Sequence, residues 1–208
     1  MAVEEGRSAR KRSAIMEAAT TLFLRKGYQG TNLDEVAAQA TVSKQTVYKN
    51  FDDKQRLFSD IVLGITERAG DRFQAMTLAL QDTDDLEKDL TEFAREYVAL
   101  VVQPQALRLR RLVIGESGRF PELARTYYER APDRAIAALA SCLRRLAERG
   151  LLRVDDPQLA ASHLAFLILS IPLDRAMFYG DDARFSATDL ERFADEGVRV
   201  FLAAYGRS

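Results

Sequence analysis

The sequence has few of the residues on which disulfide bonding and membrane insertion depend. Its 208 residues include a single cysteine, Cys142. A lone cysteine excludes an intramolecular disulfide and is typical of a reducing compartment, so we expect Cys142 to be a small buried hydrophobic residue. The longest apolar run, residues 164–173, is broken by Ser170 and Pro172 and is too short to cross a bilayer, and no secretory signal is visible. We therefore expect a soluble, cytoplasmic protein that has no membrane partner.

Motifs for catalysis and metal binding are also missing. The chain has one histidine, no HExxH sequence, no paired cysteines, no phosphate-binding glycine loop and no nucleophile elbow. The acidic run of Asp82, Asp84 and Asp85 lacks the glycine and the final glutamate of an EF-hand loop, and is more typical of a linker that caps a helix. We expect no enzymatic activity, no catalytic residues, no cofactor and no metal site.

Charge is distributed unevenly along the chain, although the net charge is only −1. Residues 7–49 include eight basic and three acidic side chains, a local charge of +5, so the remainder carries −6. Salt screens charges beyond roughly 8 to 10 Å, so a polyanion responds to the local surface. This pattern favours a nucleic-acid partner, with ordinary fluctuation of surface charge as the alternative. The basic cluster is a candidate arm toward phosphate or the minor groove; its members are Arg7, Arg10, Lys11 and Arg12.

Residues 31–50, TNLDEVAAQATVSKQTVYKN, predict two short helices around a three-residue break, the pattern of a helix-turn-helix. Asn32 and Glu35 form a capping-box pair at the first helix, with Thr31 and Asp34 as an overlapping alternative. Ser43 is placed to cap the second helix.

A hydrophobic staple between Val42 and Val47 would fix the angle of the turn. With Val47 inward, the outer surface of the second helix carries Lys44, Gln45, Thr46, Tyr48 and Lys49. Gln45 can pair with adenine, the Thr46 methyl can contact thymine, and Lys44 can bond guanine or phosphate. Tyr48 and Lys49 are better placed for phosphates. A solvated amphipathic helix in a small bundle is the alternative.

Helices are also predicted on both sides of this pair. Residues 13–26 have an apolar face that ends at Gly27, and a further helix follows the acidic cap at Asp52 and Asp53. Lys54 lies in the first turn of that helix, where a cation opposes the helix dipole. A phosphate beside this end of the helix would explain a cation at this position, because the backbone N–H groups and the ammonium would share one anion.

Together these positions resemble the N-terminal domain of TetR-type transcriptional regulators, in order and without a gap over about a quarter of the chain. They are Arg12, Ile15, Ala18, Ala19, Leu22, Phe23, Gly27, Tyr28, Thr31, Val36, Ala37, Ala40, Val42, Ser43, Thr46, Tyr48, Phe51, Lys54 and Leu57. The resemblance implies an all-α homodimer with a three-helix DNA-binding domain and a larger domain that binds a small molecule and releases DNA.

Carried over by position, the resemblance assigns phosphate contacts to Thr31, Ser43, Tyr48, Lys49 and Lys54, and base contacts to Lys44, Gln45 and Thr46. Asn32 is included in the DNA-binding set. One departure is Thr41, where the family usually has glycine in the turn. Because a β-branched residue resists positive φ, either this turn avoids a left-handed conformation or it stores strain.

The rest of the chain keeps helical spacing, which predicts about nine helices in all. We place the domains at residues 1–52 and 53–208. Pro132 should break or kink the seventh helix, Asp156 and Pro157 should begin the eighth, and a capping box from Thr188 to Glu191 should begin the last. The resemblance implies that the last two helices pair with their copies in a dimer; intramolecular packing alone is the alternative.

The candidates for a ligand pocket are aromatic and polar residues at helical spacing, for which a core or surface role is the alternative. They are Phe93, Tyr97, Arg110, Tyr128, His163 and Phe166. The sequence thus predicts a ligand-responsive regulator, by default a repressor, that binds a palindromic double-stranded DNA operator as a homodimer. A helical protein that keeps this scaffold but acts through protein partners remains the alternative.

Overall fold

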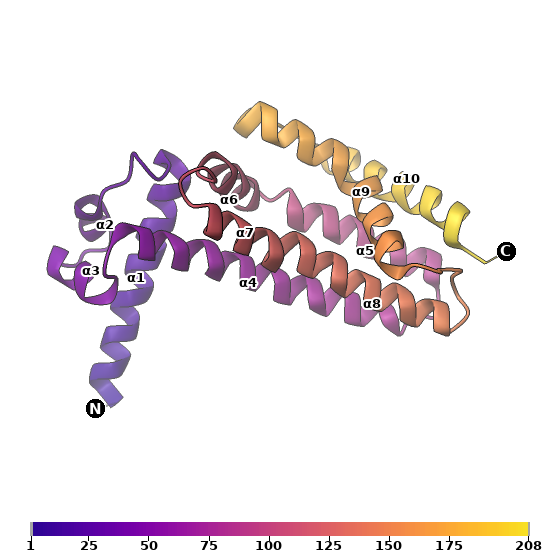
Figure 1. Cartoon of the computed structure of the whole chain (residues 1–208), viewed down its shortest axis with the longest axis horizontal. Helices are drawn as coiled ribbons and strands as arrows, with labels where there is room; N and C mark the ends of the chain where they lie inside the picture. Colours follow the sequence, from indigo (N-terminus) through magenta and orange to yellow (C-terminus); the bar gives the residue numbers. More distant parts are fainter. Residues whose placement is uncertain (1, 208) are drawn as a thin grey trace. The chain divides into compact units, whose positions relative to one another are not determined.

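The computed structural model describes the backbone of residues 2–207 and the side chains of residues 8–207, and in this range the regular structure is helical (Figure 1). An isolated antiparallel bridge joins Leu152 and Gly206. The π-helical turn Glu129–Asp133 joins α7 to α8, so the described chain has nine separate helical rods beside a short 3₁₀ turn, and the all-α prediction is confirmed. The α-helices are α1 (Ala2–Lys26), α2 (Leu33–Gln39), α3 (Lys44–Asn50), α4 (Lys54–Gln81), α5 (Leu86–Val101), α6 (Pro104–Gly115), α7 (Pro121–Tyr128), α8 (Arg134–Glu148), α9 (Pro157–Tyr179) and α10 (Ala187–Tyr205).

Two compact units make up the chain. Unit 1 is described for residues 2–65 and 109–127, and unit 2 for residues 66–108 and 128–207. The predicted domain boundary, between residues 52 and 53, precedes α4, whereas the compact units divide within α4. The reason is that the first turns of α4 bury Leu57, Phe58 and Ile61 in the core of unit 1.

Unit 1 has a core drawn from α1, α2, α3 and the start of α4, as the apolar spacing predicts. The segment 109–127 also belongs to this core, through Leu109 and Val113 of α6 and through Phe120. The ring of Phe120 meets that of Tyr28 edge-on, with 4.7 Å between centroids. The helices that contain the helix-turn-helix pattern are therefore only part of the unit in which they fold.

The helix boundaries in unit 1 follow from local capping. The Asn32 side chain accepts a hydrogen bond from the Glu35 backbone N–H at 2.8 Å, and Ser43 Oγ accepts one from Thr46 N–H at 3.2 Å, so Asn32 and Ser43 are confirmed as caps. The Glu35 carboxylate pairs with the Lys26 ammonium at 2.8 Å, so of the predicted capping box the structure shows the Asn32 half. Helix α1 begins at Ala2 rather than at Ser13, because the charged residues before Ser13 favour helix without showing an apolar face.

The turn between α2 and α3 contains Thr41 at φ +55°, the single non-glycine residue with positive φ in the described chain. Of the two predicted outcomes for this turn, the structure therefore shows the strained one, because a β-branched side chain is crowded in the left-handed region.

Unit 2 packs α5, α8 and α10 around α9. Cys142 is fully buried in this core, as predicted, and burial raises the pKa of its thiol to about 12. Arg95 of α5 and Asp195 of α10 form a two-pronged ion pair, with both N–O distances at 2.7 Å. Helix α10 crosses α9 closely at Gly197, where a Cβ would lie 3.1 Å from Ile168 Cγ1.

Of the three predictions for helix starts and breaks in unit 2, two are confirmed and one is wrong. Asp156 caps α9 with Pro157 at its first position, and Pro132 coincides with the change from α to π geometry, so both predictions are confirmed. The last capping box is formed by Ser186 and Asp189 rather than by Thr188 and Glu191. Both pairs are separated by three residues, so spacing alone does not distinguish them, and the predicted pair was wrong.

Helix α9 is the most apolar long helix of the described residues. Helix α9 and the turn after it span Pro157–Asp182, and by length and composition alone this segment could cross a membrane. Its most apolar window has a mean hydropathy of 1.3, and 44% of that window is buried. Core helices of soluble proteins pass the same test, and α9 packs against both α8 and α10. Its outward face also carries exposed apolar side chains, among them Phe166 and Phe178.

Candidate nucleic-acid interface

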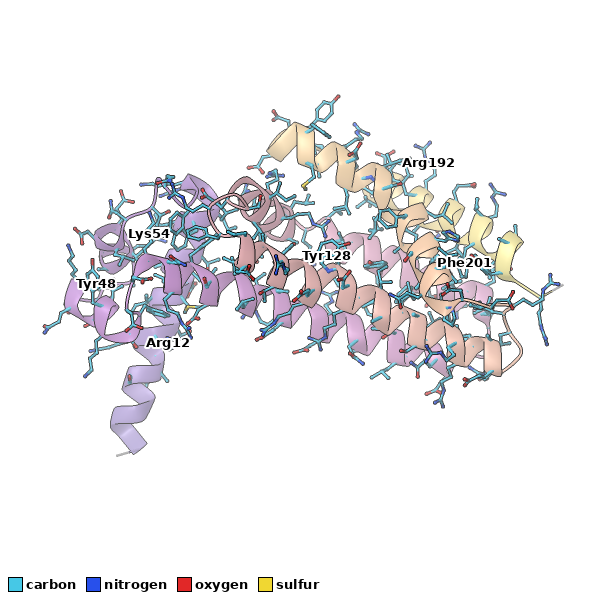
Figure 2. The ribbon with its side chains drawn as sticks, viewed as in Figure 1. Arg12, Tyr48, Lys54, Tyr128, Arg192 and Phe201 are labelled. Carbon is cyan, nitrogen blue, oxygen red and sulfur yellow. The ribbon has the colours of Figure 1, made fainter. Side chains whose placement is uncertain are left out.

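Helix α3 presents polar side chains to solvent and anchors itself through one apolar residue. Val47 is fully buried, whereas Gln45, Tyr48 and Lys49 are exposed, and Tyr48 projects from the helix surface (Figure 2). Because α3 has seven residues, these side chains occupy nearly its whole outer face. The predicted outward face of the second helix is therefore confirmed, and its groups are free to approach an external surface.

An open cleft of about 330 Å³ gathers side chains from the start of α2, the start of α3 and the start of α4. Its lining comprises Thr31, Asn32, Leu33, Asp34, Lys44, Tyr48, Asp53 and Lys54. Five of these eight residues were predicted to contact DNA from their positions in the sequence. Asp34 and Asp53 were not, because carboxylates repel phosphate and the sequence shows them only as helix caps.

Lys54 is held at the start of α4 by an aromatic ring. Its ammonium nitrogen lies 4.4 Å from the centroid of the Tyr28 ring, which is a cation–π contact. Burial lowers the pKa of Lys54, and the positive charge of Arg119 lowers it further. The helix itself is capped by Asp53, whose carboxylate accepts a hydrogen bond from the Arg56 backbone N–H at 2.7 Å. The sequence pattern did not reveal the part played by Tyr28 and Arg119, because both reach Lys54 through tertiary packing.

Lys44 is paired on the protein surface. Its ammonium lies 2.7 Å from Asp34 Oδ1, and this hydrogen-bonded partner raises the pKa of Lys44. Both side chains are more than half exposed, so the ion pair contributes little to stability. A phosphate or a guanine that approaches Lys44 has to compete with Asp34 for the same N–H donors.

Two predicted contact residues have hydroxyls that are already engaged. Thr31 is 1% exposed, and its hydroxyl donates to the Gly27 carbonyl at 2.9 Å, which closes the turn after α1. The Thr31 hydroxyl therefore has a structural role in this turn, and its contact with phosphate stays a prediction. Thr46 is half-buried, and its Oγ1 lies 2.8 Å from Ser43 Oγ.

The basic arm is helical rather than extended, because it continues α1. The Arg7 side chain lies outside the described residues. Arg10 and Lys11 are exposed, whereas Arg12 contacts residues of α3 and α4 within unit 1. Arg12 thus has partners inside unit 1, and a contact between Arg12 and DNA stays a prediction.

The six ligand-pocket candidates differ in how far they are buried. Phe93 and Tyr97 are buried in the core of unit 2, where they pack with Phe73 at centroid distances of 5.7 and 4.6 Å. Tyr128 and Phe166 are exposed.

The remaining two candidates differ again in their surroundings. His163 is exposed, and its Nδ1 lies 2.7 Å from the Tyr205 hydroxyl. Arg110 belongs to unit 1. The other five candidates belong to unit 2, and the ligand site stays a prediction. No cluster of three metal-binding side chains occurs among the described residues.

Family models match most of the sequence. Residues 15–61 match the model of bacterial regulatory proteins of the tetR family, and residues 88–207 match the C-terminal domain of AefR-like transcriptional repressors. The second match alone covers more than half of the chain. The chain belongs to the TetR family. It is accordingly a DNA-binding transcriptional regulator and not an enzyme.

Two solved regulator structures share this fold, and the sequence of a third regulator matches part of the chain. A regulator from Mesorhizobium loti MAFF303099 is 44% identical over 97% of this chain and 99% of its own, with a TM-score of 0.91. The flavonoid-responsive regulator FrrA is 30% identical over 95% of this chain and 98% of its own, with a TM-score of 0.70. The regulator YvkB of Bacillus subtilis (strain 168) is 34% identical over 76 residues, which span 36% of this chain and 37% of YvkB.

Proposed function

We propose that this TetR-family protein represses transcription by binding a palindromic DNA operator as a homodimer, and that a small molecule releases it. The observation that carries the proposal is the outward face of α3, where Gln45, Tyr48 and Lys49 are exposed beside a cleft lined by Lys44 and Lys54. A short helix with an amide and several cations on its outer face is suited to the major groove.

Different side chains have different tasks in this proposal. Gln45 contacts a base edge and so contributes to sequence preference, whereas Tyr48, Lys49 and Lys54 contact phosphates and contribute to affinity for any duplex. The N-terminus of α4 adds backbone N–H groups and a favourable dipole for an anion next to Lys54. Ser43 and Asn32 act mainly by capping the helices that carry these groups.

The test is binding to DNA selected from a random duplex pool, with affinity measured by fluorescence anisotropy at several salt concentrations. Gln45→Ala should cost about 1–3 kcal/mol on the selected site and little on random duplex. Lys54→Ala should weaken both duplexes alike and reduce the salt slope by about one. If Gln45→Ala weakens selected and random DNA equally, its assignment to a base contact is wrong.

Dimerisation is supported by the exposed face of α9. Phe166 is 68% exposed and Phe178 is 82% exposed, and further exposed apolar residues on this helix are Leu159, Leu167 and Ile171. Large aromatic side chains on one helix are costly to leave in water, and such patches mark protein interfaces. We place α9 and α10 in the dimer interface, which would set two α3 helices one DNA turn, about 34–36 Å, or a longer repeat apart.

Light scattering on the purified protein tests this interface. Phe166→Asp should shift the protein from dimer to monomer and weaken binding to a palindrome, because a monomer contacts only one half-site. Leu78→Asp is the matched control, since Leu78 is an apolar residue that is 52% exposed and belongs to α4, which is not one of the two helices proposed for the interface. A dimer that tolerates Phe166→Asp as well as Leu78→Asp would place the interface elsewhere.

The effector is proposed at the level of chemical class only. FrrA is named as flavonoid-responsive, and unit 2 of this chain has an aromatic cluster of Phe73, Phe93 and Tyr97. We therefore propose a planar aromatic effector, to be tested with a flavonoid panel. If the effector weakens DNA binding by some factor, DNA must weaken effector binding by the same factor, because the coupling between two ligands is reciprocal. Stabilisation without any change in DNA affinity would contradict the release mechanism.

A further inference from the structure

Arg12 of α1 contacts both the end of α3 and the side of α4. Its Nη2 lies 2.8 Å from Asp60 Oδ2, and its Nη1 donates to the Asn50 backbone carbonyl at 3.3 Å. Its guanidinium carbon also lies 4.4 Å from the centroid of the Phe51 ring. Arg12 is labelled in Figure 2. One side chain of α1 thus contacts the end of α3 and the first turns of α4, which lie 38 to 48 residues further along the sequence.

The Asn50 carbonyl is one of the last in α3, and a helix leaves its last four carbonyls without partners inside the helix. The Phe51 N–H donates to Val47 O at 2.9 Å, and the Asn50 side chain donates to Thr46 O at 2.8 Å. Arg12 supplies the donor for Asn50 O and places a positive charge at the negative end of the helix dipole.

This contact matters because α3 is too short to be stable by itself. Isolated helices shorter than about 12–15 residues are marginal in water, and α3 has seven. Ser43 closes its N-terminus, and Val47 anchors its middle. The C-terminus depends on Phe51, which is 2% exposed, and on Arg12, which packs on the Phe51 ring.

Asp60 fixes the other end of the guanidinium. Its side chain is 18% exposed, and its second oxygen lies 3.1 Å from Arg56 Nε. A planar guanidinium can bond Asp60 and Asn50 O while it stacks on Phe51, whereas a lysine ammonium cannot do all three. The geometry therefore depends on arginine at position 12 and not merely on a positive charge.

We propose that Arg12 is a positioning residue, which fixes the C-terminal end of α3 and thereby the angle at which Gln45 meets a base. The proposal rests on the DNA-binding function proposed above. It replaces the expectation that Arg12 is a phosphate contact of a basic arm. The two roles predict different binding behaviour, because a phosphate contact acts on every duplex whereas a positioning residue acts on sequence preference.

The test compares Arg12→Gln with Lys11→Gln, a matched loss of one exposed cation from the same part of α1. Affinities for the selected operator and for random duplex are measured across a salt series with the full-length protein. Arg12→Gln should weaken operator binding about tenfold, as for one mismatched base pair. Its random-duplex affinity should change less than about twofold, and its salt slope should stay at the wild-type value.

Two further variants separate positioning from a general loss of folding. Arg12→Lys keeps the charge but not the planar fork, so it should restore only part of the discrimination. Asp60→Asn should reduce discrimination, and the double variant Arg12→Gln/Asp60→Asn should lose less than the product of the two single losses, because both disrupt one contact. Circular dichroism confirms that each variant is folded at the assay temperature.

Three results would overturn the proposal. The first is an equal loss on operator and random duplex with the salt slope lower by about one, which assigns Arg12 to phosphate. The second is that Arg12→Gln, or Arg12→Lys, keeps the full wild-type preference for operator over random duplex. The third is a wild-type protein that prefers no DNA sequence, which defeats the proposed function itself. A wild-type preference that survives Arg12→Gln defeats only the inference about Arg12.

Discussion

Replacing Thr41 with glycine should stabilise the helix-turn-helix. Thr41 has φ +55° in the turn between α2 and α3, and its side chain is exposed. A non-glycine residue in the left-handed region costs about 1–2 kcal/mol, which Thr41→Gly would recover. Glycine loses about 0.5–1 kcal/mol through greater backbone freedom in the unfolded chain. Little packing is lost from an exposed site, so the net gain should be about 0.5–1 kcal/mol.

The gain can be measured globally and locally. Urea unfolding should be followed at one fixed protein concentration, because dimer stability depends on concentration. Hydrogen exchange at the Val42 N–H, which donates to Ala37 O at 3.0 Å across the turn, reports the same gain as slower local opening.

Thr41→Val is the control for the size and branching of the side chain. Valine keeps the β-branch and therefore the strain, so its stability should match that of the wild type within about 0.5 kcal/mol. If Thr41→Gly lowers stability, or changes it no more than Thr41→Val, the strain argument fails. Operator affinity should change less than about threefold in both variants, because φ at position 41 is already the one that glycine prefers.

Three further changes test other parts of the structure. Gly197→Ala should lower the free energy of unfolding, measured in urea, by about 1 kcal/mol, because overpacking against α9 outweighs the stabilisation that alanine usually gives a helix. Gly115→Ala is the control: nothing lies within 4 Å of its new Cβ, so this change should stabilise the protein. Since the folded-state pKa of Cys142 is raised to about 12 from 9.0, stability is lost as pH rises above 9, by about 1.4 kcal/mol at pH 10 relative to Cys142→Ala; parallel pH profiles of the two proteins would contradict this. Asp34→Asn should release Lys44 and tighten DNA binding about two- to fivefold at low salt, whereas weaker binding would show that their ion pair orients Lys44 for DNA.

The sequence by itself determined the features that depend on residues three or four positions apart. The caps at Asn32, Ser43 and Asp156, the inward face of Val47 and the outward face around Gln45 all follow from hydrogen bonds or helical spacing within one or two turns. These interactions join residues that are close together in the sequence, so the helix-turn-helix and its exposed surface could be predicted.

Only the tertiary structure decided which distant residues meet. Residues 109–127 join the core of unit 1, the Lys54 ammonium lies over Tyr28, and Arg12 turns to Asp60 and Asn50. The pattern of charge along the chain does not distinguish one cation from another, but the Arg12 guanidinium lies near a carboxylate, a backbone carbonyl and an aromatic ring, and can bond all three. Such partners are set by packing between helices, which sequence spacing does not encode.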